Sequence, residues 1–300
     1  MTIKVTLDEI LEHEEFILVD WSISNVNIRI EQFFIPHILE SKLKSIDKIK
    51  SILERNNTYT IRNVTNEIKR LQKLINNKLD RISSVKTYNK GGHRIERKPH
   101  IRPENSKLLY DIKRELSNVR RISERKELKI NDKRYDILID IVKLISIEGK
   151  LKTDFGYLMG KRGSDRSEKS DTDEKIVATL YWQSIFSNKT PTLLAQDSDF
   201  KNLLKIVTNE IGSKIFLPYN NDFREGITRN PFTLFDRQIR NGYYELVTAK
   251  DQFVYKNDFY IPKLASEKNQ KVMEEINSLW QQWHYLSNYN TQPISPACLS

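Results

Sequence analysis

Four carboxylates stand at positions where a folded chain does not normally place a charge. Asp20 directly follows the apolar run 16–19, and Asp197 follows a second apolar run, 192–195. In an open parallel sheet the carboxyl ends of the strands share one edge, and ligands bind there. We therefore expect Asp20 and Asp197 to lie at the same edge. Taken alone, each also fits a turn residue, since Asp is common after strands.

Two further acids fall on predicted helices. Glu67 lies inside the apolar stripe of the predicted helix 63–82, where a charge is costly unless it is paired or bound to a cation. Asp173 begins the predicted helix 172–186 and shares the sheet-facing side with Ile176, Val177 and Leu180. The alternatives are an acid at the edge of the stripe for Glu67 and, for Asp173, a first-turn acid favoured by the helix dipole. Asp171 is expected to be solvated.

The four acids would repel one another unless positive charge lay between them, because neighbouring carboxylates otherwise share a proton. Neither His nor Cys accompanies them, so zinc is a poor candidate. Ligands that are all oxygen favour Mg²⁺ or Mn²⁺. This chemistry suits metal-assisted hydrolysis of a phosphodiester, in which the ion activates water and neutralises the leaving oxygen.

Short buried strands that alternate with helices are typical of a three-layer α/β/α sandwich with a mainly parallel sheet. The predicted strands are 16–19, 192–195 and 214–218. The predicted helices are 24–55 with a break or kink at Pro36, 63–82, 105–128, 132–148, 172–186 and 200–211. After about residue 220 the pattern predicts a hairpin (243–247 and 252–260) and a helix (266–285), in which Trp280 and Trp283 are packing residues. We interpret 221–300 as a small α+β C-terminal extension.

The chain of 300 residues carries 50 Lys and Arg against 40 Asp and Glu, a formal charge of +10. Such an excess attracts polyanions, of which nucleic acid is the commonest. Segment 85–103 is predicted to be a flexible basic loop that either binds a phosphate backbone or is merely solvated. Its basic residues are Lys86, Lys90, Arg94, Arg97, Lys98 and Arg102.

Three absences narrow the class of protein. The single cysteine, Cys298, excludes an internal disulfide and a Cys-based metal site. No apolar run is long enough to cross a membrane, so no membrane partner is expected. The first residues lack the apolar core of a signal peptide, and we therefore expect a cytoplasmic protein.

Four short segments, in their order and element context, resemble the PIN-domain nucleases: residues 16–22, 63–68, 173–178 and 193–200. The resemblance covers about 14–220, with an unmatched basic and helical insertion at about 85–150. It implies a parallel-sheet α/β/α fold, an acidic cluster that binds Mg²⁺ or Mn²⁺, and cleavage of single-stranded RNA to a 5′-phosphate and a 3′-hydroxyl. By position, Asp20, Glu67, Asp173 and Asp197 match the four acids, Asp199 an auxiliary acid, and Ser22 a residue that supports the first acid.

The sequence therefore predicts a metal-dependent endoribonuclease with a PIN-like domain over 10–220 and an extension over 221–300. Single-stranded RNA is the expected partner, while DNA, a protein inhibitor and a second copy of the chain stay open. One alternative is a non-catalytic PIN-like scaffold that binds RNA or protein. Another is a phosphatase, but an aspartyl-intermediate phosphatase would want a second Asp at the position of Ser22.

Overall fold

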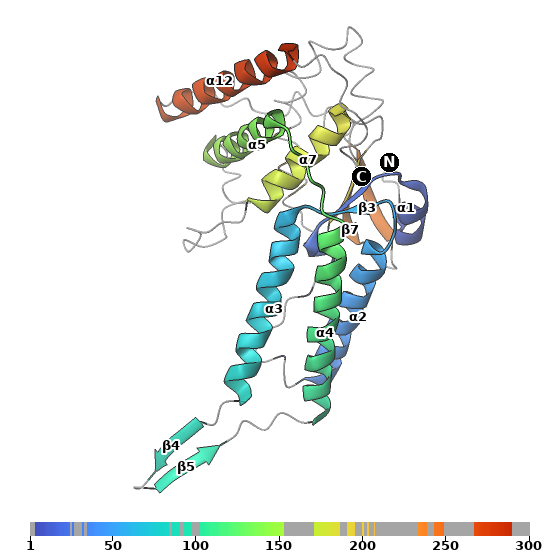
Figure 1. Cartoon of the computed structure of the whole chain (residues 1–300), viewed down its shortest axis with the longest axis vertical. Coiled ribbons are helices and arrows are strands. Elements are labelled where there is room, and N and C mark those ends of the chain that lie inside the picture. The colour runs from blue at the N-terminus through green and yellow to red at the C-terminus, as the bar shows by residue number, and fades with distance from the viewer. Residues whose placement is uncertain are drawn as a thin grey trace. The chain divides into compact units, whose positions relative to one another are not determined.

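The computed structural model describes residues 4–24, 26, 32, 35–83, 86–90, 93–97, 103–152, 171–186, 191–195, 200, 203, 207, 233–238, 243–248 and 267–289. The chain divides into two compact units (Figure 1). Residues 1–20 and 128–300 form one, which we call the sheet unit, and residues 21–127 form the other, the helical unit. Each has its own set of buried apolar side chains.

The sheet unit contains a small sheet with a parallel centre. Strands β2 (Ile17–Val19), β6 (Thr192–Leu194) and β7 (Thr233–Gln238) run parallel to one another, with Leu18 opposite Leu193 and Leu193 opposite Leu234. Strand β8 (Tyr243–Thr248) pairs antiparallel with β7 and with β1 (Lys4–Thr6). Every residue of β2 and β6 is buried, as expected for strands that are apolar on both faces. The chain is thus an α/β protein with a small, partly parallel sheet.

Four helices belong to the sheet unit: α1 (Leu7–His13), α5 (Lys133–Lys152), α7 (Thr172–Phe186) and α12 (Glu267–Tyr289). Helix α5 packs against both α7 and α12, and Figure 1 shows it between them. Trp182, Phe186 and Trp283 form an aromatic cluster there, and the Arg134 guanidinium lies over the Phe186 ring at 4.7 Å. Trp280 and Trp283 are buried, which confirms their predicted packing role.

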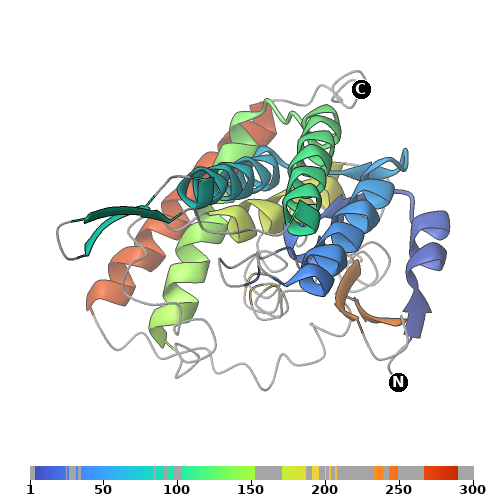
Figure 2. The same ribbon diagram turned by 90° about the horizontal axis from the view of Figure 1, so that it is seen from below.

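The helical unit is built on three long helices: α2 (Pro36–Leu53), α3 (Arg62–Ser83) and α4 (Pro103–Arg125). Helix α4 packs against both α2 and α3 (Figure 2). The unit also contains the 3-10 helix η1 (Trp21–Ser24) and the short strand β3 (Thr58–Tyr59). A buried hydroxyl cluster joins α3 to the end of α4, because Ser123 lies 2.7 Å from the Thr65 hydroxyl and accepts a hydrogen bond from the Thr60 hydroxyl through its carbonyl.

Most predicted helices and two predicted strands are confirmed. The helices predicted over 63–82, 105–128, 132–148, 172–186 and 266–285 correspond to α3, α4, α5, α7 and α12, and the strands 16–19 and 192–195 to β2 and β6. Residues 200, 203 and 207 are helical and buried, in line with the helix predicted over 200–211. The strand predicted over 214–218 lies outside the described residues, and so does the domain boundary predicted at about residue 220.

The prediction over 24–55 included a break or kink at Pro36, and the break is confirmed. Between Ser24 and Pro36 the structure describes only residues 26, 32 and 35. Residues Trp21–Ser24 form a 3-10 helix, and α2 begins at Pro36 and runs straight on to Leu53. A proline in the first turn costs no hydrogen bond, because the first N–H groups of a helix have no partner within it. Pro36 therefore marks a helix start rather than a kink.

The prediction of a flexible basic loop over 85–103 is also wrong. Strands β4 (Lys86–Lys90) and β5 (His93–Arg97) form an antiparallel hairpin. Two short runs separated by Gly91-Gly92 carry a hairpin signal that outweighs their polar composition. Lys98 and Arg102 lie outside the described residues.

The C-terminal hairpin differs from its predicted form. The strand predicted over 243–247 is present as β8, but its hairpin partner is Thr233–Gln238, and the predicted partner 252–260 lies outside the described residues. Because β7 also pairs with β6, residues beyond 221 contribute two strands to the same sheet as β2.

Candidate functional site

Asp20 follows the last residue of β2 at the carboxyl end of a buried parallel strand. Its backbone N–H donates a hydrogen bond of 3.1 Å to the carbonyl of Leu194, so the pairing of β2 with β6 continues to Asp20 itself. The residue is only 5% exposed. A buried carboxylate is tolerated where hydrogen bonds or a cation replace the lost water. The predicted place of Asp20, at the carboxyl end of a parallel strand, is confirmed.

Strand β6 ends at the same edge, because it runs parallel to β2 with Val19 opposite Leu194. Ala195 follows Leu194 and is fully buried. Ala195, two residues before Asp197, therefore lies just past the end of β6 at this edge. Asp197 and Asp199 themselves lie outside the described residues.

Asp173 lies in the first turn of α7 and is half-buried. Ile176, Val177 and Leu180 are fully buried, so the apolar side predicted for this helix is confirmed. Helix α5 fixes the start of α7, since the Ser146 hydroxyl donates a hydrogen bond of 3.0 Å to Glu174. This contact and those of Asp171 hold the backbone of Asp173 in place.

Asp171 differs from the prediction, which expected it to be solvated. It is half-buried and forms ion pairs with Lys143 at 3.0 Å and with Lys175 at 3.1 Å. Burial alone would raise the pKa of Asp171, but the hydrogen bonds from the two lysines outweigh it and lower the pKa. The sequence could not reveal this pairing, because Lys143 comes from α5.

Glu67 and Ser22 belong to the helical unit. Glu67 is half-buried on α3, between the buried residues Val64 and Ile68, which fits the alternative of an acid at the edge of the apolar stripe. Ser22 is half-buried in η1, which packs against α3 and begins directly after Asp20 in the chain. The helical unit thus places the helix that carries Glu67 beside the segment that carries Ser22.

The proposed site residues are therefore divided between the units: the ligands Asp20 and Asp173 lie in the sheet unit, and the ligand Glu67 and the supporting residue Ser22 lie in the helical unit. Within the described ranges no three His, Cys, Asp or Glu residues form a group that could hold a metal ion. The predicted ligand set also includes Asp197 and Asp199, which lie beyond those ranges. The complete set stays a prediction.

Four of the predicted nucleic-acid-binding residues lie in the hairpin: Lys86, Lys90, Arg94 and Arg97. The register pairs Lys86 with Arg97, so two cationic residues lie opposite one another. Like charges opposite one another on neighbouring strands are destabilising, and a bound anion would relieve that repulsion. Their role in binding stays a prediction.

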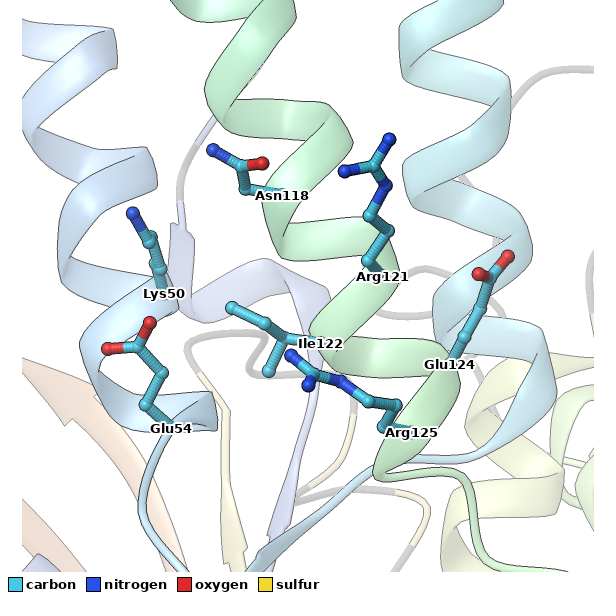
Figure 3. A pocket seen from close by; sticks show the side chains of 7 residues that line it. All are labelled: Lys50, Glu54, Asn118, Arg121, Ile122, Glu124 and Arg125. Carbon is cyan, nitrogen blue, oxygen red and sulfur yellow. The ribbon is translucent and has the colours of Figure 1, made fainter.

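The helical unit contains an open groove between α2 and α4, with a volume of about 680 Å³ (Figure 3). The sequence did not predict this groove. Two arginines one helical turn apart on α4, Arg121 and Arg125, are among the residues that line it. The spacing of four residues was visible in the sequence, but the groove depends on the packing of α2 beside α4.

Comparison of the chain with models of protein families, with curated proteins and with solved structures finds no match. Among the helices that the structure describes, none combines the length and apolarity needed to cross a lipid bilayer.

Proposed function

We propose that this chain is a Mg²⁺- or Mn²⁺-dependent endoribonuclease with a PIN-like, three-layer α/β/α nuclease domain. One observation carries the proposal: Asp20 is buried at the carboxyl end of a parallel strand, and its backbone is fixed to the strand that leads to Asp197. This edge is where open parallel sheets bind their ligands. In this proposal the acid at this edge holds a cation.

The donor set fits a hard divalent cation. Asp20, Glu67, Asp173 and Asp197 offer only carboxylate oxygens, and Mg²⁺ and Mn²⁺ prefer such ligands. Gathering these acids in one place would be costly, because neighbouring carboxylates repel one another. A merely structural protein has no reason to bear that cost. The number of acids therefore favours catalysis over a binding scaffold.

Each residue has a proposed role. Asp20 and Asp197 hold the main ion, Ser22 supports Asp20, and Asp199 assists Asp197. Asp173 and Glu67 complete the ligand shell or orient the attacking water. A bound ion supplies an activated water and neutralises the charge that develops on the leaving oxygen. Hydrolysis by this route leaves a 5′-phosphate and a 3′-hydroxyl, with single-stranded RNA as substrate.

The proposal is tested by incubating the purified chain with labelled single-stranded RNA and with DNA of the same sequence, each in Mg²⁺, Mn²⁺ or EDTA. We expect cleavage only with a metal ion, and a fall of about 10²–10³-fold in the rate for Asp20→Asn. Asp136→Asn is the matched control, because it also neutralises an acid of the sheet unit but one at an exposed position of α5. Its cleavage rate should stay near that of the wild type.

Two results would count against the proposal: cleavage that persists in EDTA, or cleavage that Asp20→Asn leaves unchanged. The second candidate, a non-catalytic scaffold, is favoured by the basic surface of the helical unit, which suits binding without chemistry. It predicts metal-independent RNA binding and no products with either ion.

A further inference from the structure

Only one of the two units of the chain has a net positive charge. Residues 21–127 contain 25 Lys and Arg against 12 Asp and Glu, a formal charge of +13. The sheet unit contains 25 Lys and Arg against 28 Asp and Glu, a formal charge of −3. A field that is concentrated in this way attracts polyanions to the helical unit. The question is which surface of that unit receives them.

The helical unit contains an open groove between α2 and α4. Figure 3 shows side chains from α2 on one side of it and from α4 on the other. The residues that line it are Lys50, Glu54, Asn118, Arg121, Ile122, Glu124 and Arg125. Its volume is about 680 Å³.

Most of the charges at or beside this groove are already paired. The Lys50 ammonium donates a hydrogen bond of 3.0 Å to Glu115, which neutralises it. Glu124 accepts ion pairs from Lys69 at 3.1 Å and from Arg120 at 3.7 Å. The opposite charges within these ion pairs largely cancel, so the pairs add little net charge to the groove. The same contacts hold the side chains of the groove walls in place.

Arg121 and Arg125 are the lining cations outside these pairs, and Glu54 is the lining acid outside them. Both arginines are exposed, and neither forms an ion pair with another residue in the part of the chain that the structure describes. Residues four apart on a helix have Cβ atoms about 5–6 Å apart, so the two guanidinium groups can act on one ligand. The planar donors of arginine match the oxygens of a phosphate.

We propose that the groove between α2 and α4 binds the phosphodiester backbone of a single-stranded nucleic acid through Arg121 and Arg125. The formal charge of +13 in this unit attracts a ligand more strongly the more negative charges that ligand carries. A polyanion is therefore favoured over a small phosphate. The proposal concerns binding alone, and it holds whether or not the chain cuts the strand. Glu54, which is exposed in the same groove, opposes the bound phosphates.

The experiment measures the affinity of the full chain for a labelled oligouridine by fluorescence anisotropy, in EDTA and over a range of salt concentrations. The double variant Arg121→Gln/Arg125→Gln should bind at least about tenfold more weakly. Its log–log salt slope should be smaller by about 1.4, since each lost phosphate contact on a single strand accounts for about 0.7. Glu54→Gln should bind more tightly than the wild type.

The matched control is Arg70→Gln/Lys73→Gln, which removes the same charge from exposed positions of α3 that do not line the groove. Its affinity should fall less than about threefold, because it acts only through the long-range field. Circular dichroism on heating checks that both variants keep their fold. Equal losses in the two double variants would show that binding follows diffuse charge, and this would overturn the proposal.

A labelled oligoglutamate separates nucleic acid from an acidic protein. Binding as tight as that of oligouridine, with the same loss in the groove variant, would assign the groove to an acidic protein and overturn the proposal. Asp20→Asn serves as the last arm, and its cleavage of oligouridine is measured in Mn²⁺. If the groove variant binds normally while Asp20→Asn stops cleavage, the groove proposal fails and the proposed nuclease stands. If the groove variant loses binding while Asp20→Asn leaves cleavage unchanged, the nuclease proposal fails and the groove proposal stands.

Discussion

The two units of this chain use charge in opposite ways. The sheet unit has a formal charge of −3; it buries one acid, Asp20, at the end of a strand and pairs another, Asp171, with two lysines. The helical unit has a formal charge of +13 and leaves Arg121 and Arg125 exposed without an acid partner among the described residues. Buried charge acts over short distances on a ligand in a fixed position, whereas exposed charge attracts a ligand from afar. In our account the first serves chemistry and the second serves binding.

The units also differ in how the chain builds them. The parallel centre of the sheet joins segments near residues 17, 192 and 233, so its formation depends on contacts far apart in the sequence. The helical unit is a continuous stretch in which α2, α3 and α4 follow one another. Substitutions in the two units should therefore separate stability from binding.

The largest expected effect on stability is in the sheet. Leu18 in β2 is 0% exposed, and Leu18→Ala should lower the free energy of unfolding by about 2–5 kcal/mol, because it removes buried methyl groups and leaves a cavity. The matched control lies in the helical unit, where Leu74 is 43% exposed and Leu74→Ala should change stability by less than about 0.5 kcal/mol. Unfolding in urea measures both values. Comparable losses for the two variants would contradict the burial of β2.

A smaller effect concerns Glu115 in the helical unit, which forms an ion pair with Lys50 of the groove wall. The hydrogen bond from Asn118, opposed by burial and supported by those from Lys50 and Arg114, lowers the pKa of Glu115 below its ordinary value. Because the folded-state pKa is the lower one, the ionised carboxylate contributes stability above the unfolded-state pKa. That contribution is lost as the pH falls through the folded-state pKa.

Glu115→Gln should therefore cost about 0.2–1 kcal/mol at neutral pH and nothing at a pH below the folded-state pKa. Thermal unfolding as a function of pH measures this difference. Glu40→Gln, at an exposed position of α2, gives the same change in net charge and serves as the control. A pH-independent cost for Glu115→Gln would mean that the side chain acts through packing rather than through its charge.

Local patterns predicted the elements that carry the candidate acids. The apolar run before Asp20 and the stripe around Glu67 were readable because burial repeats with the period of a strand or a helix. The capping box of α1, in which Thr6 and Glu9 bond each other's backbone N–H, was also present in the sequence and was missed. The pairing of β8 with β1 could not be predicted, because no local signal sets a register between residues 240 positions apart in the chain.

The candidate sites also contain features that the sequence predicts and features that depend on contacts between distant elements. The burial of Asp20 follows from its place after an apolar strand, whereas the ion pairs of Asp171 depend on a lysine from another helix. Arg121 and Arg125 were overlooked because α4 also carries four other basic residues, Lys107, Lys113, Arg114 and Arg120. Only the neighbours supplied by α2 and α3 show which cations are already paired.

The central claim is that Asp20 and its partner acids gather around one divalent ion. The most direct test is a crystal structure of the chain soaked in Mn²⁺, with the ion located by its anomalous scattering. Our account predicts an ion bound by the carboxylates of Asp20 and Asp197, with Asp173 and Glu67 as ligands or within one water of it. An Asp20 carboxylate without an ion, or Glu67 and Asp173 many ångströms from it, would contradict the account.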